Sequence, residues 1–316
     1  MRLTLGMAHF DDFHGAVFTL QSLALHHALH DYELIIVDNN PGSAHGQALA
    51  GFCASTGQRR DGTIRYIAAP EATGTTQPRE RIFAEARGEI VACMDPHVLL
   101  QVGALDALLG WYAANPDSLD LVSGPLIYND FANVSTHFEP AWNAEMWGVW
   151  ATDPRGLNPV GEPFDVWGQG LGFFSCRKAA WLGFNPHFRQ FGGEEGYIHE
   201  KFRQAGRRVL CHPALRWWHR FERPDGVKYP LGRYAKVRNY VLGHQELGMD
   251  LAPVHQHFVA SGLMPVAEWD HLLADPIAHE QPPGCNTCGG GGSNQPQPAA
   301  AQTLDELFAW VKSTPR

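Results

Sequence analysis

The first 127 residues alternate short apolar runs with segments that carry apolar side chains at helical spacing, and this alternation constrains the fold more than any other feature. The apolar runs predict buried strands at residues 3–8, 34–37, 63–68, 89–94 and 119–127. The periodic segments predict helices at residues 15–30, 78–86 and 102–114. Because strands that alternate with helices form a mostly parallel sheet covered on both faces, the sequence predicts an α/β fold.

Two of the predicted strands end in aspartate. Asp38 follows the run at residues 34–37, and Asp95 follows the run at residues 89–94. Ligands of mostly parallel sheets bind at the carboxyl ends of the strands. We therefore expect both carboxylates to belong to one ligand site.

The pattern changes after residue 127. Residues 128–167 are irregular, rich in proline and aromatic, which predicts a loop-rich insertion over the sheet edge. Its four tryptophans either fill a small core or offer a surface on which a sugar stacks: Trp142, Trp147, Trp150 and Trp167. Regular patterns then predict strands at residues 170–175 and 208–211 and helices at residues 194–204 and 229–247.

The balance of charge limits the partners of the chain. Its 316 residues include 24 lysines and arginines against 33 aspartates and glutamates, for a formal net charge of -9. Nucleic-acid binding needs basic side chains gathered on one face, so a nucleic-acid partner is disfavoured. No run approaches the ~18 apolar residues of a membrane helix, and acidic residues interrupt the N-terminus before a signal-peptide core could form. We expect a cytoplasmic protein without a membrane span.

Cysteine usage does not predict a disulfide framework. Cys285 and Cys288 form a CxxC pair, but a structural zinc site needs four ligands. His271 and His279 could complete such a site, and a pair of loop thiols is the simpler interpretation. The four scattered cysteines are expected to be reduced thiols in the core: Cys53, Cys93, Cys176 and Cys211.

The C-terminal region divides into a linker and a short helix. Residues 281–302 contain a run of glycine, proline and glutamine that buries too little apolar surface to fold. In residues 303–316, Thr303 and Glu306 form a capping-box pattern before an apolar helix face. A helix this short is unstable alone, so we expect it to dock on its own domain or to join two copies of the chain.

The strongest local motif is Asp95-Pro96-His97, immediately after a predicted strand. A carboxylate and an imidazole converging at a strand end suit a divalent ion that binds nucleotide phosphates. The alternative is a turn in which Asp95 caps a following helix, with Pro96 at its first position.

With these residues, the chain resembles the family 2-like glycosyltransferases of the GT-A fold over about residues 1–222. The nearest branch includes the polypeptide N-acetylgalactosaminyltransferases and the β-1,4-galactosyltransferases. Asp95-Pro96-His97 is similar to the family's Asp-x-His motif, and residues 88–94 resemble its glycine-led strand. Residues 35–40 resemble the strand-end Asp motif, and Arg79 matches an arginine near the donor.

The second half carries three further motifs of this family. Residues 168–173 resemble the glycine-rich strand beneath the donor sugar, where small residues let a ligand approach the backbone. Residues 191–195 resemble the aromatic-Gly-Gly-Glu-acid motif, and His219 lies where the family supplies a metal-binding histidine.

This resemblance implies a Rossmann-like nucleotide-sugar half at residues 1–122, an acceptor and catalytic half at 123–225, and a small helical extension at 226–280. It implies Mn²⁺ or Mg²⁺ at Asp95, His97 and His219. The residues implied to bind a nucleotide-sugar donor, most simply a UDP-sugar, are His9, Asp38, Arg79, Asp95, Gln169 and Gly170.

The resemblance also implies a hydroxyl acceptor and a catalytic pair, Glu194 and Glu195. Glu195 is the expected general base, since the helix dipole favours its ionised form. An acid at this position is typical of the inverting galactosyltransferases, whereas Asp95-Pro96-His97 is typical of the retaining branch. We expect inversion, with retention as the alternative.

Other functions remain alternatives. A GT-A protein without catalysis would only bind nucleotide or glycan, but the metal-binding residues and Glu195 argue against it. A nucleotidyltransferase would usually carry lysine or arginine in a glycine-rich loop after the first strand, and residues 8–15 contain neither. The acceptor stays open among polysaccharide, lipid-linked sugar, protein and a modified DNA base, which the acidic charge disfavours.

Overall fold

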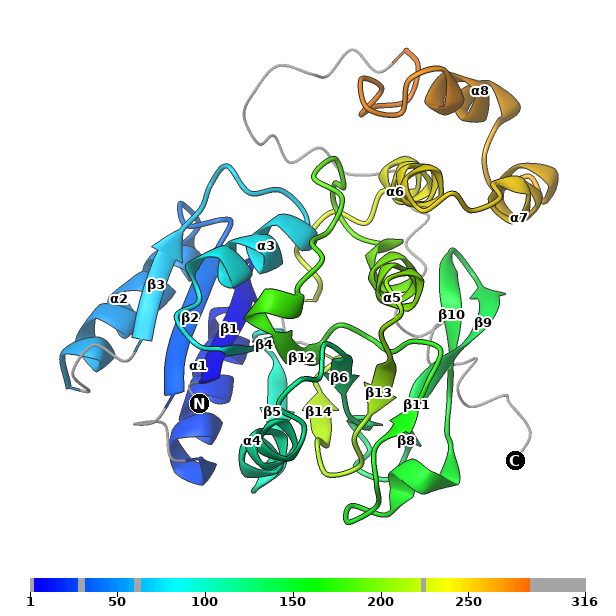
Figure 1. Ribbon diagram of the computed structural model, residues 1–316. Coiled ribbons are helices and arrows are strands. Elements are labelled where there is room, and N and C mark those ends of the chain that lie inside the picture. The colour runs from blue at the N-terminus through cyan, green and yellow to red at the C-terminus, as the bar shows by residue number, and fades with distance from the viewer. Residues whose placement is uncertain (1–2, 28–31, 60–63, 223–225, 285–316) are drawn as a thin grey trace.

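A computed structural model describes residues 3–27, 32–59, 64–222 and 226–284. Its centre is an eight-stranded sheet in the order β11-β13-β6-β12-β4-β1-β2-β3, with helices on both faces (Figure 1). The strands are β1 (Leu3–His9), β2 (Tyr32–Asp38), β3 (Ile64–Ala68), β4 (Ile90–Met94), β6 (Leu121–Ser123), β11 (Phe164–Asp165), β12 (Phe173–Arg177) and β13 (Val209–Cys211).

Strand direction divides this sheet into two parts. Strands β1, β2, β3 and β4 run parallel to one another, as expected from alternation with helices. Strand β12 is antiparallel to both β4 and β6, and β6 is parallel to β13. Strands from both predicted halves of the chain therefore share one sheet, and β4 and β12 lie side by side at its centre.

Five helices cover the sheet and form two apolar cores. They are α1 (Phe13–His26), α2 (Ala44–Arg59), α3 (Thr76–Glu85), α4 (Ala104–Ala114) and α5 (Glu194–Gln204). Along β2, Leu34 and Ile36 face one core while Ile35 and Val37 face the other, so every position of the strand is buried. This is the two-residue alternation of a strand covered on both sides.

A second, four-stranded sheet lies beside the first in the order β5-β14-β7-β8. Its strands are β5 (Val98–Leu100), β7 (Leu126–Ile127), β8 (Val134–Ser135) and β14 (Trp217–His219). The predicted strand at 119–127 is wrong as one element, because β6 and β7 belong to different sheets. Gly124 lies between them, packed against the backbone of Leu215. A Cβ at this position would be 1.9 Å from the Leu215 carbonyl oxygen, so only glycine fits there.

Residues 128–167 are more regular than predicted. They contain a hairpin of β9 (His137–Asn143) and β10 (Met146–Ala151), then a 3₁₀ turn at Pro154–Leu157. The prediction of a loop-rich segment is therefore wrong at residues 137–143 and 146–151, which are strands. A further 3₁₀ turn, Lys178–Ala180, follows β12.

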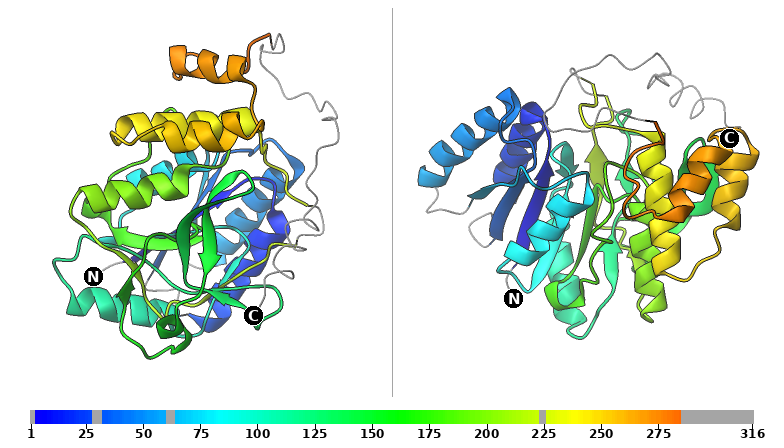
Figure 2. Two further views of the ribbon diagram at one scale, coloured as in Figure 1. Left: turned by 90° about the vertical axis from the view of Figure 1, so that its right-hand side faces the viewer. Right: turned by 90° about the horizontal axis from the view of Figure 1, so that it is seen from above.

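The helical extension is confirmed and has its own core. It contains α6 (Arg233–Glu246), α7 (Ala252–His255), a π turn (Gln256–Ala260) and α8 (Val266–Ala274). The left view of Figure 2 shows α6 between α5 and α8. Apolar side chains of α6 to α8 pack together, and Trp142 and Trp147 of the hairpin pack against them.

Most of the other predicted elements match the structure to within a few residues at each end, and helix α2 was not predicted. The four scattered cysteines are buried and free, as expected. The CxxC pair and the predicted helix in 303–316 lie outside the described residues. Among the described helices, none is both long enough and apolar enough to cross a membrane.

Candidate active site

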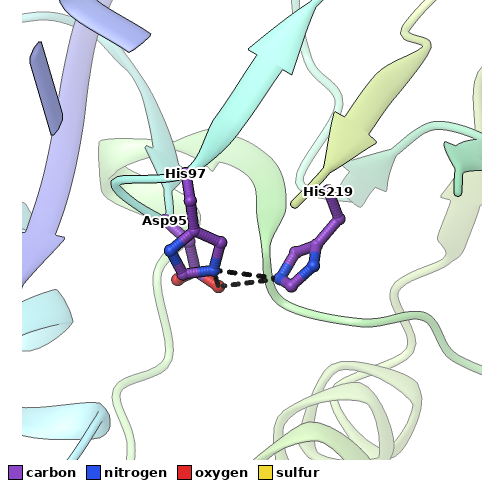
Figure 3. A group of neighbouring side chains, drawn as sticks. All are labelled: Asp95, His97 and His219. Carbon is purple, nitrogen blue, oxygen red and sulfur yellow. Dashed lines mark hydrogen bonds and ion pairs between the residues drawn. The ribbon is translucent and has the colours of Figure 1, made fainter. Parts of the chain in front are cut away.

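Three side chains converge at the carboxyl end of β4. Asp95 follows β4, His97 immediately precedes β5, and His219 ends β14 (Figure 3). The Nε2 atoms of His97 and His219 lie 3.1 Å apart, and each is 3.9 Å from Oδ2 of Asp95. The alternative interpretation, in which Asp95 caps a helix, is wrong, because Pro96 and His97 form a turn into a strand.

The three donor atoms fit a divalent transition-metal ion. They lie within 4.8 Å of one another, the only such group of metal-binding side chains found among the described residues. An octahedral ion with bonds of about 2.1 Å keeps adjacent donor atoms about 3 Å apart, close to the separation of the two imidazole nitrogens. Two imidazoles and a carboxylate suit Mn²⁺ better than Mg²⁺, which prefers oxygen donors alone.

The Asp12 carboxylate orients the His97 imidazole. Nδ1 of His97 lies 3.0 Å from Oδ2 of Asp12, so the opposite ring nitrogen faces His219. Asp12 is itself fixed, because its Oδ1 accepts a hydrogen bond from the Gly15 N–H at 3.0 Å and caps α1. Carboxylate–histidine pairs of this kind fix the tautomer of a metal ligand. Asp12 was not among the predicted site residues; its signal was an N-cap aspartate between the first strand and the first helix.

Arg79 holds the other oxygen of Asp95. Its guanidinium donates to Oδ1 of Asp95 at 2.8 Å and to the Thr75 carbonyl at 3.1 Å. Burial opposes the charge of Arg79, but attraction from Asp95 and Glu194 outweighs it and raises the arginine pKa. Burial likewise opposes ionisation of Asp95, yet Arg79, His219 and His97 hold its pKa far below the usual range. Asp95 is therefore a carboxylate at neutral pH.

A pocket of about 420 Å³ opens beside the triad, a size typical of small-molecule sites. Its walls come from the end of β1, the loop before α3, residues 189–191 and residues 229–230. Arg79, Asp95 and His97 line it, as do Glu280 and Gln281 from the end of the helical extension. The sequence analysis missed these last two residues because they lie at the border of the predicted linker.

His9 and Asp38 form a buried pair at this pocket. His9 lines it, whereas Asp38 has no exposed surface and is absent from its lining. Oδ1 of Asp38 lies 3.2 Å from Nδ1 of His9, and Oδ2 accepts a hydrogen bond from Tyr66 at 2.6 Å. The Asp12 N–H donates to Nε2 of His9, so Nδ1 carries the proton of the neutral ring. In this conformation Asp38 positions His9 rather than facing the pocket.

Gln169 and Gly170 lie away from this pocket. Gln169 is buried and donates to the Thr136 carbonyl, and neither residue is part of the pocket lining. A Cβ on Gly170 would come within 2.8 Å of the Trp150 ring and 3.7 Å of Oε1 of Glu195. The glycine thus permits close packing of an indole next to a candidate catalytic carboxylate.

Glu194 and Glu195 begin α5 after two glycines in the left-handed region, with φ of 107° at Gly192 and 89° at Gly193. Glu194 is buried and accepts hydrogen bonds from the Thr75 hydroxyl and the Gly192 N–H, both at 2.7 Å. It therefore connects α5 to the start of α3 rather than facing a ligand.

Glu195 accepts a hydrogen bond from the Leu171 N–H at 3.2 Å. Burial, and then repulsion from Glu194, raise its pKa well above the usual range. Both effects oppose ionisation of Glu195, whereas the sequence interpretation considered only the helix dipole, which favours it. The same effects make Glu195 a stronger proton acceptor once it is ionised.

Solved structures with the same fold define the class. GalNAc-T7 with UDP, GalNAc and Mn²⁺ has a TM-score of 0.64 at 16% identity, covering 87% of this chain and 54% of that one. Mannosyltransferase PcManGT from Pyrobaculum calidifontis, with GDP-Man and Mn²⁺, has a TM-score of 0.53 at 15% identity, covering 88% and 77%. TarS 1-349 from S. aureus has a TM-score of 0.52 at 12% identity, covering 87% and 80%. The protein has the GT-A fold.

The sequence itself places the chain in a family. The profile of Glycosyl transferase family 2 matches residues 17–177, which is just over half of the chain, and the chain belongs to that family. No curated protein matches the chain significantly. The chain spans about half the length of GalNAc-T7, so the activity of that whole protein does not transfer with the fold.

Proposed function

We propose that the protein is a metal-dependent glycosyltransferase that moves a sugar from a UDP-sugar to an acceptor hydroxyl with inversion. The observation that carries this proposal is the convergence of Asp95, His97 and His219 beside the 420 Å³ pocket. Supporting evidence comes from the solved relatives, two of which hold a nucleotide or nucleotide-sugar together with Mn²⁺.

Asp95, His97 and His219 would hold Mn²⁺, which supplies Lewis-acid stabilisation of the departing diphosphate. Arg79 keeps Asp95 ionised and turns its second oxygen toward the histidines. His9, oriented by Asp38, is the residue of this wall that reaches the donor. A direct contact between Asp38 and the nucleotide base would require the His9 side chain to move.

Glu195 accepts the acceptor's proton in this proposal. The hydroxyl oxygen forms a bond to the anomeric carbon while the bond from that carbon to the diphosphate oxygen breaks and its electron pair leaves with the diphosphate. The hydroxyl proton passes to Oε1 or Oε2 of Glu195. Its raised pKa increases its proton affinity, and Leu171 fixes its direction. Gln169 and Gly170 lie outside the donor pocket and shape the backbone beside Glu195, and Glu194 stabilises the turn that presents Glu195.

The remaining assignments follow from the same site. A hexose is the proposed transferred group, and residues 1–122 and 123–225 are the proposed donor and acceptor halves. Cytoplasmic location and self-association through residues 303–316 stay predictions. A nucleic-acid acceptor is disfavoured by the net charge of -9.

The test is a donor screen with the full chain. UDP-sugars and GDP-mannose are incubated with Mn²⁺ or with EDTA, and released nucleoside diphosphate is measured. Hydrolysis of a UDP-sugar in Mn²⁺ that stops in EDTA supports the proposal. Equal hydrolysis in EDTA contradicts the proposed metal dependence. Release of GDP alone contradicts the proposed UDP-sugar donor. The anomeric configuration of the product, read by NMR, decides between inversion and retention.

A further inference from the structure

Three indole rings surround the helix turn that carries Glu195. A Cβ on Gly196 would lie 3.3 Å from the Trp147 ring and 3.9 Å from the Trp167 ring. The rings of Trp147 and Trp167 meet edge to face at 6.0 Å. The third ring, Trp150, and Oε1 of Glu195 both lie close to one glycine, Gly170.

These rings come from a framework that fixes them. Trp147 and Trp150 belong to β10, and Trp142 of the same hairpin packs against Tyr240 and Phe258 of the helical extension. The backbone N–H of Trp147 donates to the Tyr240 hydroxyl at 2.8 Å, which ties the hairpin to α6. The hairpin indoles are therefore held before any ligand arrives, which lowers the entropic cost of stacking a sugar on them. Trp167 lies outside the hairpin, and the Arg203 guanidinium lies over its ring, 5.3 Å from the centroid.

A second pocket shares Trp167 with this cluster. It has a volume of about 300 Å³ and is lined by His137, Phe138, Glu139, Pro140, Asp153, Arg155, Asp165, Val166 and Trp167. Trp167 belongs to both places, since its ring lies near Gly196 and the residue also lines the pocket. An elongated ligand that spans Glu195 and this pocket would lie against Trp167 and would meet carboxylate hydrogen-bond acceptors in the pocket.

The charges of this pocket favour a neutral ligand. Its one lining arginine, Arg155, is paired with Asp153 at 2.7 Å, and Asp165 is paired with Arg208 at the same distance. Glu139 is exposed and adds a negative charge. Burial lowers the pKa of His137, which leaves its imidazole neutral at pH 7. A phosphate polymer or a nucleic acid would meet carboxylates and a committed arginine, whereas sugar hydroxyls can donate to these same carboxylates.

We propose that Trp147, Trp167 and the 300 Å³ pocket form the acceptor site and that the acceptor is a neutral oligosaccharide. The inference rests on the proposed transferase function, because it places the sugar unit to be modified at Glu195. The unit next to it stacks on the indoles, and more distant units lie in the pocket.

The test measures binding of defined glycans to the full chain loaded with UDP and Mn²⁺. The neutral probes are maltohexaose, cellohexaose, chitohexaose and mannohexaose, and the anionic probes are a heparin hexasaccharide and an oligothymidylate. Saturation-transfer NMR and calorimetry give the affinities for wild type, Trp167→Ala, Trp167→Phe and the control Trp111→Ala, which removes an indole from α4. UDP binding is measured separately for each variant.

We expect at least one neutral hexasaccharide to bind about tenfold or more tightly than either anionic probe. Trp167→Ala should weaken that binding about tenfold, Trp167→Phe should restore part of it, and Trp111→Ala should leave it unchanged. Failure of all four neutral probes on a chain that binds UDP would overturn the inference, as would equal binding by Trp167→Ala or by an anionic probe. Failure of UDP itself to bind would instead contradict the proposed function.

Discussion

Nε2 of His97 lies 3.1 Å from Nε2 of His219, although 122 positions separate the two residues in the chain. The contact exists because β14 pairs with β5, which places His219 opposite Val98, the residue after His97. Two imidazole nitrogens aimed at one point beside a carboxylate can share a cation, and neither ring supplies that site alone.

The first prediction is that both histidines are required for metal-supported nucleotide binding. His97→Ala and His219→Ala should each weaken UDP binding in Mn²⁺ by about tenfold or more, with little effect on UDP binding in EDTA. Isothermal titration calorimetry measures both affinities, and His26→Ala, an exposed histidine on α1, is the control. Unchanged Mn²⁺-dependent affinity in both variants would remove the triad from the site.

A second prediction concerns Asp12, which contacts His97 and caps α1. Asp12→Asn should lower Mn²⁺ affinity about 10- to 100-fold, because the amide no longer provides a negative charge behind the imidazole. The same substitution should leave the melting temperature nearly unchanged, because asparagine caps helices as well as aspartate does. Electron paramagnetic resonance of free Mn²⁺ and a thermal melt separate the two effects. A large fall in melting temperature would show that the carboxylate is mainly structural.

Glu195 yields a prediction in which activity and stability move in opposite directions. Glu195→Gln should lower kcat about 10²- to 10⁴-fold while donor affinity stays nearly constant, since the amide cannot accept the proton. Wild-type kcat should rise with pH as the raised pKa is passed, because only the carboxylate is a base.

The stability effect has a defined sign. A carboxyl whose pKa is raised in the folded state stabilises that state below its unfolded pKa and loses this contribution as pH rises through the folded value. Glu195→Gln should therefore melt higher than wild type at alkaline pH and show little advantage at acidic pH. Melts in EDTA across this range test it, with Glu200→Gln on the same helix as the control. A Glu195→Gln protein with normal kcat would exclude Glu195 as the base.

The sequence predicted the framework of the site because its strands carry strong apolar runs. Asp95 could be placed at a strand end since residues 90–94 are apolar throughout and fully buried. Helix α2 could not be predicted, because three glycines and a mixed polar pattern hide its buried face. The position of His219 relative to His97 depended on pairing between distant strands, which local pattern does not encode; family resemblance supplied it instead.

Burial explains the larger differences between expectation and structure. The resemblance placed Asp38 at the nucleotide base, yet His9 and Tyr66 enclose its carboxylate. Sequence placed Glu195 at a helix start, but only the packed structure shows that loss of solvent dominates its titration. The sequence also contains no sign that residues 280–281 line the pocket. Their position depends on a tertiary contact, because Arg238 of α6 holds the preceding segment through the carbonyls of Pro276 and Ile277.

The last prediction separates the end of the helical extension from the tail behind it. Truncation after Pro283 should retain donor hydrolysis, because Glu280 and Gln281 still line the donor pocket. Truncation after Asp275 should abolish it, because the wall is lost and the buried Arg238 loses two of its carbonyl partners, Pro276 and Ile277. Loss of hydrolysis in a folded chain that ends at Pro283 would show that residues 284–316 complete the site.

A point substitution tests the same wall without removing any backbone. Glu280 lies 3.0 Å from Arg189, and both side chains line the pocket. A UDP diphosphate is negative, so Glu280 repels it and also occupies the Arg189 guanidinium. Glu280→Gln should therefore tighten UDP binding a few-fold, a size limited by the partial exposure of both groups. Arg189→Gln should weaken binding by a similar factor, and the exposed Asp270→Asn on α8 should change nothing.

Because rising salt screens exposed charges, the difference between Glu280→Gln and wild type should shrink at high ionic strength. A difference that persists in high salt would mean that Glu280 acts through the shape of the wall and not through its charge.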